Sequence, residues 1–135
     1  MRFSCRACGN CCVTRGAYGF VYVSRAERRR LAALLAIPTG SFTRRYCVKA
    51  GGFFHLRDRG RDCIFLVNRR CAVYPARPGQ CATWPFWPEN LADGAWVPAV
   101  RRDCPGTRHG RRLSAAAVAQ RVQLERDREA TIWSW

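Results

Sequence analysis

Residues 3–12 read FSCRACGNCC, a stretch in which four cysteines stand within eight positions. Two residues separate Cys5 from Cys8 and Cys8 from Cys11, and Cys12 follows Cys11 directly. A two-residue spacing lets a short loop turn neighbouring thiolates toward one centre, and Gly9 adds backbone freedom inside that loop. The stretch therefore predicts a metal-binding loop.

The remaining cysteines divide into a second group and one outlier. The outlier, Cys47, matches no ligand spacing, and we interpret it as a small buried hydrophobic residue on a helix. The Cys-x2-Cys spacing of residues 5–12 is not followed by the helix and βαβ pattern that a thioredoxin-like dithiol requires. We therefore predict eight metal ligands, which are Cys5, Cys8, Cys11, Cys12, Cys63, Cys71, Cys81 and Cys104.

Length and composition restrict the class of protein. The chain has 135 residues, of which 48% are hydrophobic, which is enough for a single domain with one core. Its longest apolar run, residues 31–37, is far shorter than the ~20 residues of a bilayer span. The first residues lack the apolar segment of a secretory signal. We therefore expect a cytoplasmic protein without a membrane partner, in which dense cysteines are typical of metal or redox chemistry rather than disulfides.

The charge is strongly positive. The formal net charge is +15, and all 24 basic residues except Lys49 are arginine. That sum counts cysteines as neutral, so each metal-bound thiolate lowers it by one unit, and nearby arginines stabilise thiolates. The arginines are spread along the whole chain and form no evenly spaced stripe with aromatic residues. We therefore expect weak nucleic-acid binding driven by charge, and no specific recognition.

Two helices have clear boundaries in the sequence. Ser24 and Glu27 form a capping box, and the helix that they open places leucines on one face before Pro38 and Gly40 end it. Residues 41–46 add one or two helical turns, and Ser114 caps a last helix that ends near Trp133. The side chains expected to be buried are Leu31, Leu34, Leu35, Ala116, Val118, Val122, Leu124 and Ile132.

The rest of the chain predicts short strands and irregular segments. Strand-like patterns cover residues 17–23, 52–56, 63–67 and 96–100, and prolines exclude regular structure between residues 75 and 88. The fold class is therefore α+β, a small single domain of short strands and two to three helices around an irregular, cysteine-rich core tied by metal. We divide it into a cysteine-cluster domain, residues 1–112, and a C-terminal helix packed on it, residues 113–135.

The cysteine motifs closely resemble the CxxCxxCC cysteine-cluster family, also called the YkgJ type, which is described as zinc- or iron-chelating. The resemblance extends from residue 3 to about residue 110 and implies a metal-binding domain. One departure is Ala82, where an arginine often follows the cysteine in the family. The matching motifs are Phe3-x-Cys5-x2-Cys8-Gly9-x-Cys11-Cys12, Cys63-x-Phe65-Leu66, Cys71-x2-Tyr74-x2-Arg77-Pro78-x2-Cys81 and Cys104-Pro105-Gly106.

The ligand pattern is compatible with two kinds of metal. Thiolate sites suit both zinc and iron–sulfur clusters, and two four-cysteine zinc sites would use all eight ligands. The vicinal Cys11 and Cys12 do not easily serve one ion, so they serve two centres or one of them is a hydrogen-bonding thiol beside the metal. The Cys5, Cys8 and Cys11 spacing with a distant fourth cysteine resembles a [4Fe–4S] pattern. We therefore favour an iron–sulfur cluster or iron over zinc.

Residues between the cysteines suggest further roles. We predict that Arg77 and Tyr74 lie beside the metal, where Arg77 either donates to thiolate or sulfide or binds an anionic substrate. The alternative is that Arg77 stacks on Trp84 or Trp87 and fixes the loop. His109 is a better candidate nitrogen ligand than His55, which we interpret as a residue of a strand face. We expect the segment 84–88 to pack over the cysteine core. The main function predicted is metal binding with a redox or metal-handling role. The alternatives are a metal-dependent enzyme that uses Arg77 and a basic nucleic-acid binder resembling a zinc ribbon; no catalytic residue is predicted.

Overall fold

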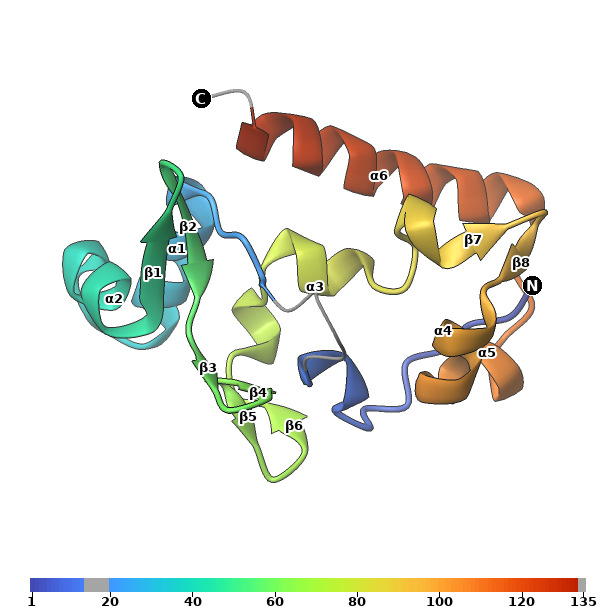
Figure 1. Cartoon of the computed structure of the whole chain (residues 1–135), viewed down its shortest axis with the longest axis horizontal. Coiled ribbons are helices and arrows are strands. Elements are labelled where there is room, and N and C mark those ends of the chain that lie inside the picture. Colours follow the sequence, from blue (N-terminus) through green and yellow to red (C-terminus); the bar gives the residue numbers. More distant parts are fainter. Residues whose placement is uncertain (14–19, 134–135) are drawn as a thin grey trace. The chain divides into compact units, whose positions relative to one another are not determined.

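A computed structural model of the chain describes residues 1–13 and 20–133 (Figure 1). Its contacts divide the chain into two compact units, a terminal unit of Met1–Cys11 with Thr83–Trp135 and a central unit of Cys12–Ala82. Both units combine helices with short antiparallel strand pairs, so the α+β class is confirmed. The domain boundary expected at residue 112 falls inside the terminal unit and stays a prediction.

The central unit is built from helices followed by three hairpins. A 3-10 turn, η1 (Asn10–Cys12), lies at its start, and the unit ends in α3 (Gly79–Thr83). Antiparallel pairs join β1 to β2, β3 to β4 and β5 to β6. Its remaining elements are α1 (Arg25–Leu34), α2 (Thr39–Tyr46), β1 (Cys47–Ala50), β2 (Phe53–Leu56), β3 (Asp58–Arg59), β4 (Asp62–Cys63), β5 (Leu66–Val67), β6 (Arg70–Cys71) and η2 (Tyr74–Ala76).

The terminal unit contains a fourth hairpin and the longest helix. Its elements are η3 (Pro88–Asn90), β7 (Leu91–Ala92), β8 (Ala95–Trp96), α4 (Pro98–Asp103), α5 (Gly106–His109) and α6 (Ala115–Trp133). The described residues thus hold six α-helices, more than the two to three expected. Three of them, α1, α2 and α6, have eight residues or more and match the helices that the sequence predicts.

The capping box at α1 is confirmed. The amide of Glu27 donates to the Ser24 hydroxyl, and the amide of Ser24 donates to the Glu27 carboxylate. Leu31 is fully buried in the core of the central unit, but Leu34 is 44% exposed, so its predicted burial is wrong. The helix ends at Leu34, four residues before Pro38, which instead precedes the first residue of α2. Gly40 therefore lies inside α2 rather than ending α1.

The strand predictions hold for one segment and fail for two. The strand over residues 52–56 is confirmed as β2, whereas residues 63–67 contribute to two separate hairpins and not to one strand. Residues 98–100 are helical in α4, since a proline at the first helical position needs no amide hydrogen bond. Residues 17–19 lie outside the described residues, and Tyr22 contributes an isolated bridge to His55.

Helices also form where prolines predicted none. The five residues of α3 lie between Pro78 and Pro85, because a single helical turn fits between two prolines that bound it. In the terminal unit the amide of Ala117 donates to the Ser114 hydroxyl, which confirms the predicted cap of α6. Ile132 is buried, and Val118 and Val122 pack against a core cluster; the predicted burial of Ala116 and Leu124 is wrong, since both are exposed.

Candidate metal centre

The eight predicted ligands lie in both units in equal number. All nine cysteines are thiols in the structure. In residues 1–13 and 20–133, no three cysteine, histidine or acidic side chains are placed at metal-ligating distances. The terminal unit holds Cys5, Cys8, Cys11 and Cys104, called the terminal set below; the central unit holds Cys12, Cys63, Cys71 and Cys81, the central set.

Two thiols of the terminal set, Cys8 and Cys11, lie within electrostatic range of the Cys104 thiol. Cys8 and Cys11 are on the N-terminal loop and η1, and Cys104 directly follows α4. Burial raises the pKa of the Cys104 thiol, and Cys8 and Cys11 raise it further. The side chain of Asn10 donates a 2.8 Å hydrogen bond to the carbonyl of Asp103, which ties the loop to the residue before Cys104.

Cys104 is held by hydrogen bonds to its sulfur and by apolar packing. The side chain of Trp84 and the backbone of Thr107 hydrogen-bond to the Cys104 thiol, and both interactions oppose the rise in its pKa. The thiol is 8% exposed and lies in a core cluster with Phe86 and Trp96. N–H donors to sulfur stabilise a thiolate, so this environment suits a metal ligand. The expectation that segment 84–88 packs around a cysteine is therefore confirmed for Trp84 and Phe86.

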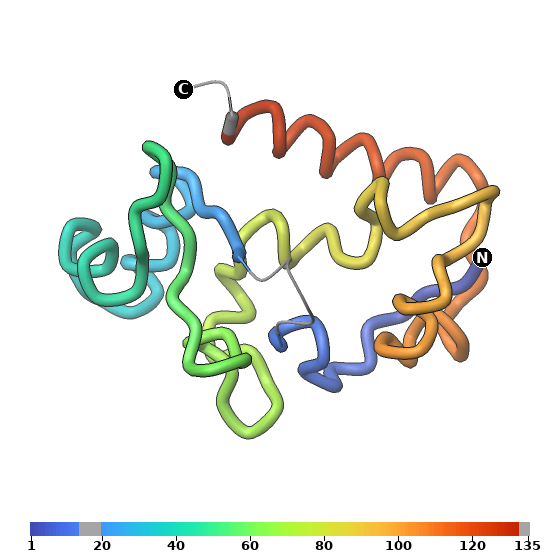
Figure 2. Tube along the Cα trace, in the orientation of Figure 1, coloured from blue at the N-terminus to red at the C-terminus, as the bar shows by residue number. Residues whose placement is uncertain are grey.

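A close backbone contact brings the N-terminal segment to α5. The amide of Ser4 donates to the carbonyl of Gly106 across 3.2 Å, and the amide of Phe3 donates to the carbonyl of Arg111 across 2.9 Å. A Cβ at Gly106 would lie 2.0 Å from the Ser4 carbonyl oxygen, and one at Gly110 would lie 2.2 Å from the Ser4 nitrogen. In Figure 2 the blue N-terminal trace runs alongside the orange segment that contains α5.

Sequence reasoning missed these two glycines as positioning residues. The signal was present in the Cys104-Pro105-Gly106 motif, but the contact of Gly106 with the other end of the chain requires the tertiary structure. Gly106 and Gly110 permit the approach of residues 3–4, and Cys5 follows directly. They therefore help to position the first cysteine of the terminal set.

The central set is arranged on hairpin strands and α3. Val13 forms an isolated antiparallel bridge with Asp62, and the chain neighbours of these two residues are Cys12 and Cys63. Cys71 pairs with Leu66 across the β5–β6 hairpin, and both Cys63 and Cys71 pack against the core cluster of the central unit. Cys81 lies on α3.

Glu27 connects α1 to the segment that carries Cys81. It is 8% exposed, and its second carboxylate oxygen accepts a 2.5 Å hydrogen bond from the amide of Gly79. The side chain of the neighbouring Gln80 bonds to the backbone of Phe20 and Tyr22. The capping-box pattern predicts the local role of Glu27, whereas its contact with Gly79 appears only in the fold.

Arg77 is engaged with its neighbour in the family motif. Its guanidinium carbon lies 4.0 Å from the centroid of the Tyr74 ring, and Nη1 donates to the Tyr74 carbonyl across 3.1 Å. The stacking expected for Arg77 is therefore present, but its aromatic partner is Tyr74 rather than Trp84 or Trp87. The binding of a substrate by Arg77 and the position of Tyr74 beside a metal stay predictions.

The two histidines differ in burial. His55 is 6% exposed, stacks on Phe20 with ring centroids 4.0 Å apart, and its Nδ1 lies 2.9 Å from the Leu56 carbonyl oxygen. This packing agrees with the interpretation of His55 as a residue of a strand face. His109 is exposed at the end of α5, and its role as a nitrogen ligand stays a prediction.

Cys47 has the character of a core residue. It is 3% exposed and belongs to the core cluster of the central unit, at the first position of β1 rather than on a helix. Burial raises the pKa of its thiol to about 11, although Arg28 and Arg57 oppose the rise. A thiol that ionises so reluctantly is a poor metal ligand, which supports its exclusion from both sets.

The donor chemistry fits a thiophilic metal. Each unit supplies four of the predicted ligand thiols, the number that a tetrahedral zinc site or a four-iron cluster uses. Together, the α+β fold and the clustered thiols define a cysteine-rich metal-binding protein. The chain belongs to the CxxCxxCC family, whose model, described as a "putative zinc- or iron-chelating domain", matches residues 4–105. The resemblance inferred from the motifs is thereby confirmed.

One further comparison and one property of the helices concern the fold. No solved structure matches the chain at a significant level. None of the helices described for residues 1–13 and 20–133 combines the length and apolar composition that a bilayer crossing requires.

Proposed function

We propose that this protein binds iron, as an iron–sulfur cluster or as iron ions, at two separate centres. Cys5, Cys8, Cys11 and Cys104 would hold the first, and Cys12, Cys63, Cys71 and Cys81 the second. The observation that carries the proposal is the 2.8 Å hydrogen bond from the Asn10 side chain to the Asp103 carbonyl, which holds the loop of Cys8 and Cys11 against the residue before Cys104 inside the terminal unit.

The vicinal pair supports two centres. Cys11 is the last residue of the first segment of the terminal unit, and Cys12 is the first residue of the central unit. Consecutive side chains do not easily converge on one ion, so a division between Cys11 and Cys12 removes that difficulty. The isolated antiparallel bridge of Val13 with Asp62, the chain neighbours of Cys12 and Cys63, supports the assignment of these two cysteines to the same centre.

The choice of iron rests on ligand spacing. Cys5, Cys8 and Cys11 follow the two-residue spacing of iron–sulfur ligand runs, and Cys104 supplies the distant fourth thiolate. Bound iron would add electron-transfer chemistry, and a redox or metal-handling role follows from that. A cytoplasmic location agrees with this proposal, because a reducing compartment keeps eight ligand thiols available for metal.

Single cysteine substitutions test the division into two centres. Protein purified without oxygen would be analysed for iron, zinc and sulfide, and its intact mass measured under non-denaturing conditions. Cys104→Ser should remove one centre and Cys81→Ser the other, so that each retains about half of the metal. Cys11→Ser should match Cys104→Ser, and Cys12→Ser should match Cys81→Ser. Cys47→Ser is the matched control and should retain the metal content of the unmodified protein.

The same variants can contradict each part of the proposal. Loss of all metal from both Cys104→Ser and Cys81→Ser would indicate one shared centre. Equal loss from Cys47→Ser would show that the assignment of ligands is wrong. A colourless protein with stoichiometric zinc would reject iron and leave the division into two sets standing.

A further inference from the structure

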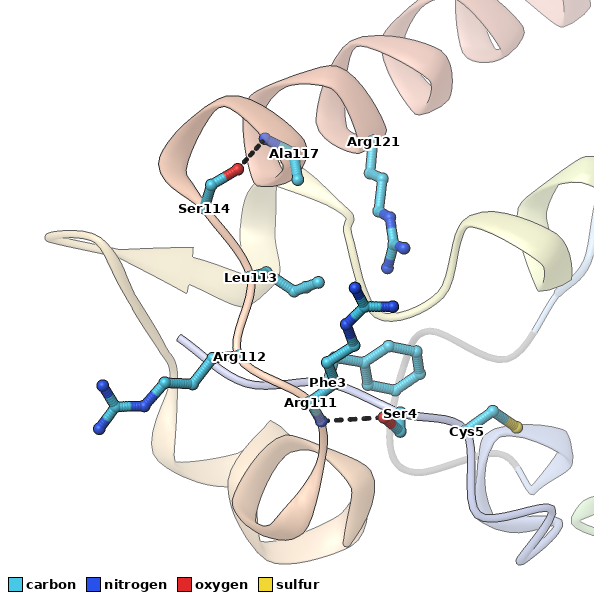
Figure 3. A pocket seen from close by; sticks show the side chains of 9 residues that line it. All are labelled: Phe3, Ser4, Cys5, Arg111, Arg112, Leu113, Ser114, Ala117 and Arg121. Carbon is cyan, nitrogen blue, oxygen red and sulfur yellow. Dashed lines mark hydrogen bonds between the residues drawn. The ribbon is translucent and has the colours of Figure 1, made fainter.

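A pocket of about 630 Å³ lies in the terminal unit beside Cys5. Its walls come from the N-terminal segment, from residues 111–114 and from the first turns of α6 (Figure 3). Arg111, Arg112 and Arg121 line it, and no acidic side chain does. The pocket therefore combines a concave shape with positive charge, and neither the cysteine motifs nor the metal proposal accounts for it.

Two of the three arginines face each other. In Figure 3 the guanidinium groups of Arg111 and Arg121 point toward one another, whereas that of Arg112, which also lines the pocket, points away from this pair. Arg121 also packs over the Phe86 ring, with its guanidinium carbon 4.9 Å from the ring centroid, which restricts where this charge can move. Two like charges that face each other repel, and a bound anion would remove that repulsion.

These two charges have no counterion in the described part of the chain. The side chains that pair with carboxylates there are Arg102 and Arg128, and neither lines the pocket. Arg111 makes its hydrogen bonds through its backbone, since its amide donates to the Ser4 hydroxyl and its carbonyl accepts from the amide of Phe3. Arginine guanidinium groups bind oxyanions through two parallel hydrogen bonds, so both groups can bind a ligand.

Two serine hydroxyls add donors to the pocket. Ser4 Oγ accepts from the amide of Arg111 across 2.9 Å, and Ser114 Oγ accepts from the amide of Ala117 across 3.1 Å. Each hydroxyl keeps its own proton, which it can donate to a ligand oxygen. Ser114 also caps the 19-residue helix α6, whose N-terminus carries partial positive charge.

We propose that this pocket binds the phosphate group of a small molecule. Two guanidinium groups match the double negative charge of a phosphate monoester, and the added hydroxyls match its several acceptor oxygens better than the two oxygens of a carboxylate. The volume leaves room for an organic group attached to the phosphate. Cys5 lines the same pocket, so the ligand would lie beside the first cysteine of the terminal set.

Equilibrium dialysis with radiolabelled inorganic phosphate tests the proposal. The full chain, purified without oxygen and with its metal, would be titrated at constant ionic strength in chloride. The unmodified protein should bind phosphate saturably at one site. Arg111→Gln and Arg121→Lys should each weaken binding about tenfold or more, the usual effect of losing a charge-assisted hydrogen bond. Arg112→Gln removes the same charge from a guanidinium that points away from Arg111 and Arg121, so it should change affinity less than about twofold.

The controls separate this site from the metal and from general charge. Metal content and thermal unfolding of each variant would be measured beside binding, and Arg121→Lys keeps an aliphatic stem against Phe86.

Equal weakening of phosphate binding by Arg112→Gln would overturn the proposal, because it would indicate a diffuse charge effect. Loss of phosphate binding in Cys5→Ser with no change in the arginine variants would also overturn it, since phosphate would then bind the metal. If the unmodified protein showed no saturable binding of phosphate, the proposal would also be overturned. Acetate would be added as a competitor at the same total concentration of negative charge as phosphate. If acetate competes as well as phosphate does, the phosphate assignment is rejected.

Discussion

The backbone of Ser4 lies directly against Gly106. Their amide–carbonyl hydrogen bond measures 3.2 Å, and a Cβ on Gly106 would come within 2.0 Å of the Ser4 carbonyl oxygen. No real Cβ tolerates such a distance, so the N-terminal segment can occupy its place only if residue 106 is glycine. The contact fixes the residue before Cys5 against the helix that follows Cys104.

Gly106→Ala should therefore displace the N-terminal segment and lower the metal content of the terminal set. Overpacking of this kind costs about 1–3 kcal/mol of the free energy of unfolding. Gly40→Ala is a suitable control, because its new methyl group would meet the flexible end of Arg44 at 3.3 Å. Metal analysis and urea unfolding of both variants would test the prediction. Full metal content in Gly106→Ala would show that the contact does not position Cys5.

Removal of metal should lower the melting temperature of the protein. Six of the eight described strands have two residues each, and two of the hairpins that they form carry Cys63 or Cys71. Such short hairpins are marginal without added cross-links, which metal–thiolate bonds would supply. Calorimetry before and after anaerobic chelation would measure the change. A metal-free protein that melts at the same temperature would contradict the prediction.

Cys47 should be the least reactive thiol of the metal-free protein that remains folded. With a pKa of about 11 and 3% exposure, roughly one in a thousand of its thiols is ionised at pH 8. Alkylation by iodoacetamide, followed by peptide mass spectrometry over time, would rank the nine sites. Exposed Cys5 is the comparison, and equal rates at Cys5 and Cys47 in folded protein would contradict the burial of Cys47.

Glu125 should give the protein a pH-dependent stability. Burial raises the pKa of its carboxyl, although the hydrogen bond from Thr83 and the charge of Arg128 oppose the rise. Between the ordinary and the raised pKa the folded state binds more protons than the unfolded state, so the free energy of unfolding falls as pH rises through this window. Urea unfolding would measure the free energy of unfolding of the unmodified protein and of Glu125→Gln over a range of pH. Relative to Glu125→Gln, the unmodified protein should become less stable as the pH rises. A constant difference would contradict the raised pKa.

Nucleic-acid binding should be weak and lost at physiological salt. The net charge of +15 attracts phosphates at low ionic strength, and such binding falls by roughly one log unit per log unit of salt for each phosphate neutralised. Fluorescence anisotropy with several DNA and RNA sequences at two salt concentrations would measure it. Tight binding at physiological salt with a preference for one sequence would favour the nucleic-acid function instead.

Much of the local structure follows from the sequence because its causes are local. The cap of α1 by Ser24 and Glu27 and the cap of α6 by Ser114 are contacts three residues apart, so spacing alone predicts them. The family and the cysteine motifs are equally readable, because ligand spacing is a property of the chain. Predictions failed where a residue's environment depends on distant partners, as for the exposed side chains of Leu34 and Leu124.

What only the tertiary structure decided is which distant residues meet. Ser4 contacts Gly106, about a hundred residues further along the chain. Such distant contacts also divide the adjacent Cys11 and Cys12 between two units. They likewise set the surroundings in which the guanidinium groups of Arg111 and Arg121 face each other. Spacing cannot predict them, because chain folding over about a hundred residues is set by the sum of many packing contacts. The sequence by itself therefore determined the kind of chemistry, thiolate binding of metal, and the fold determined which segments of the chain, with their thiols and charges, lie together.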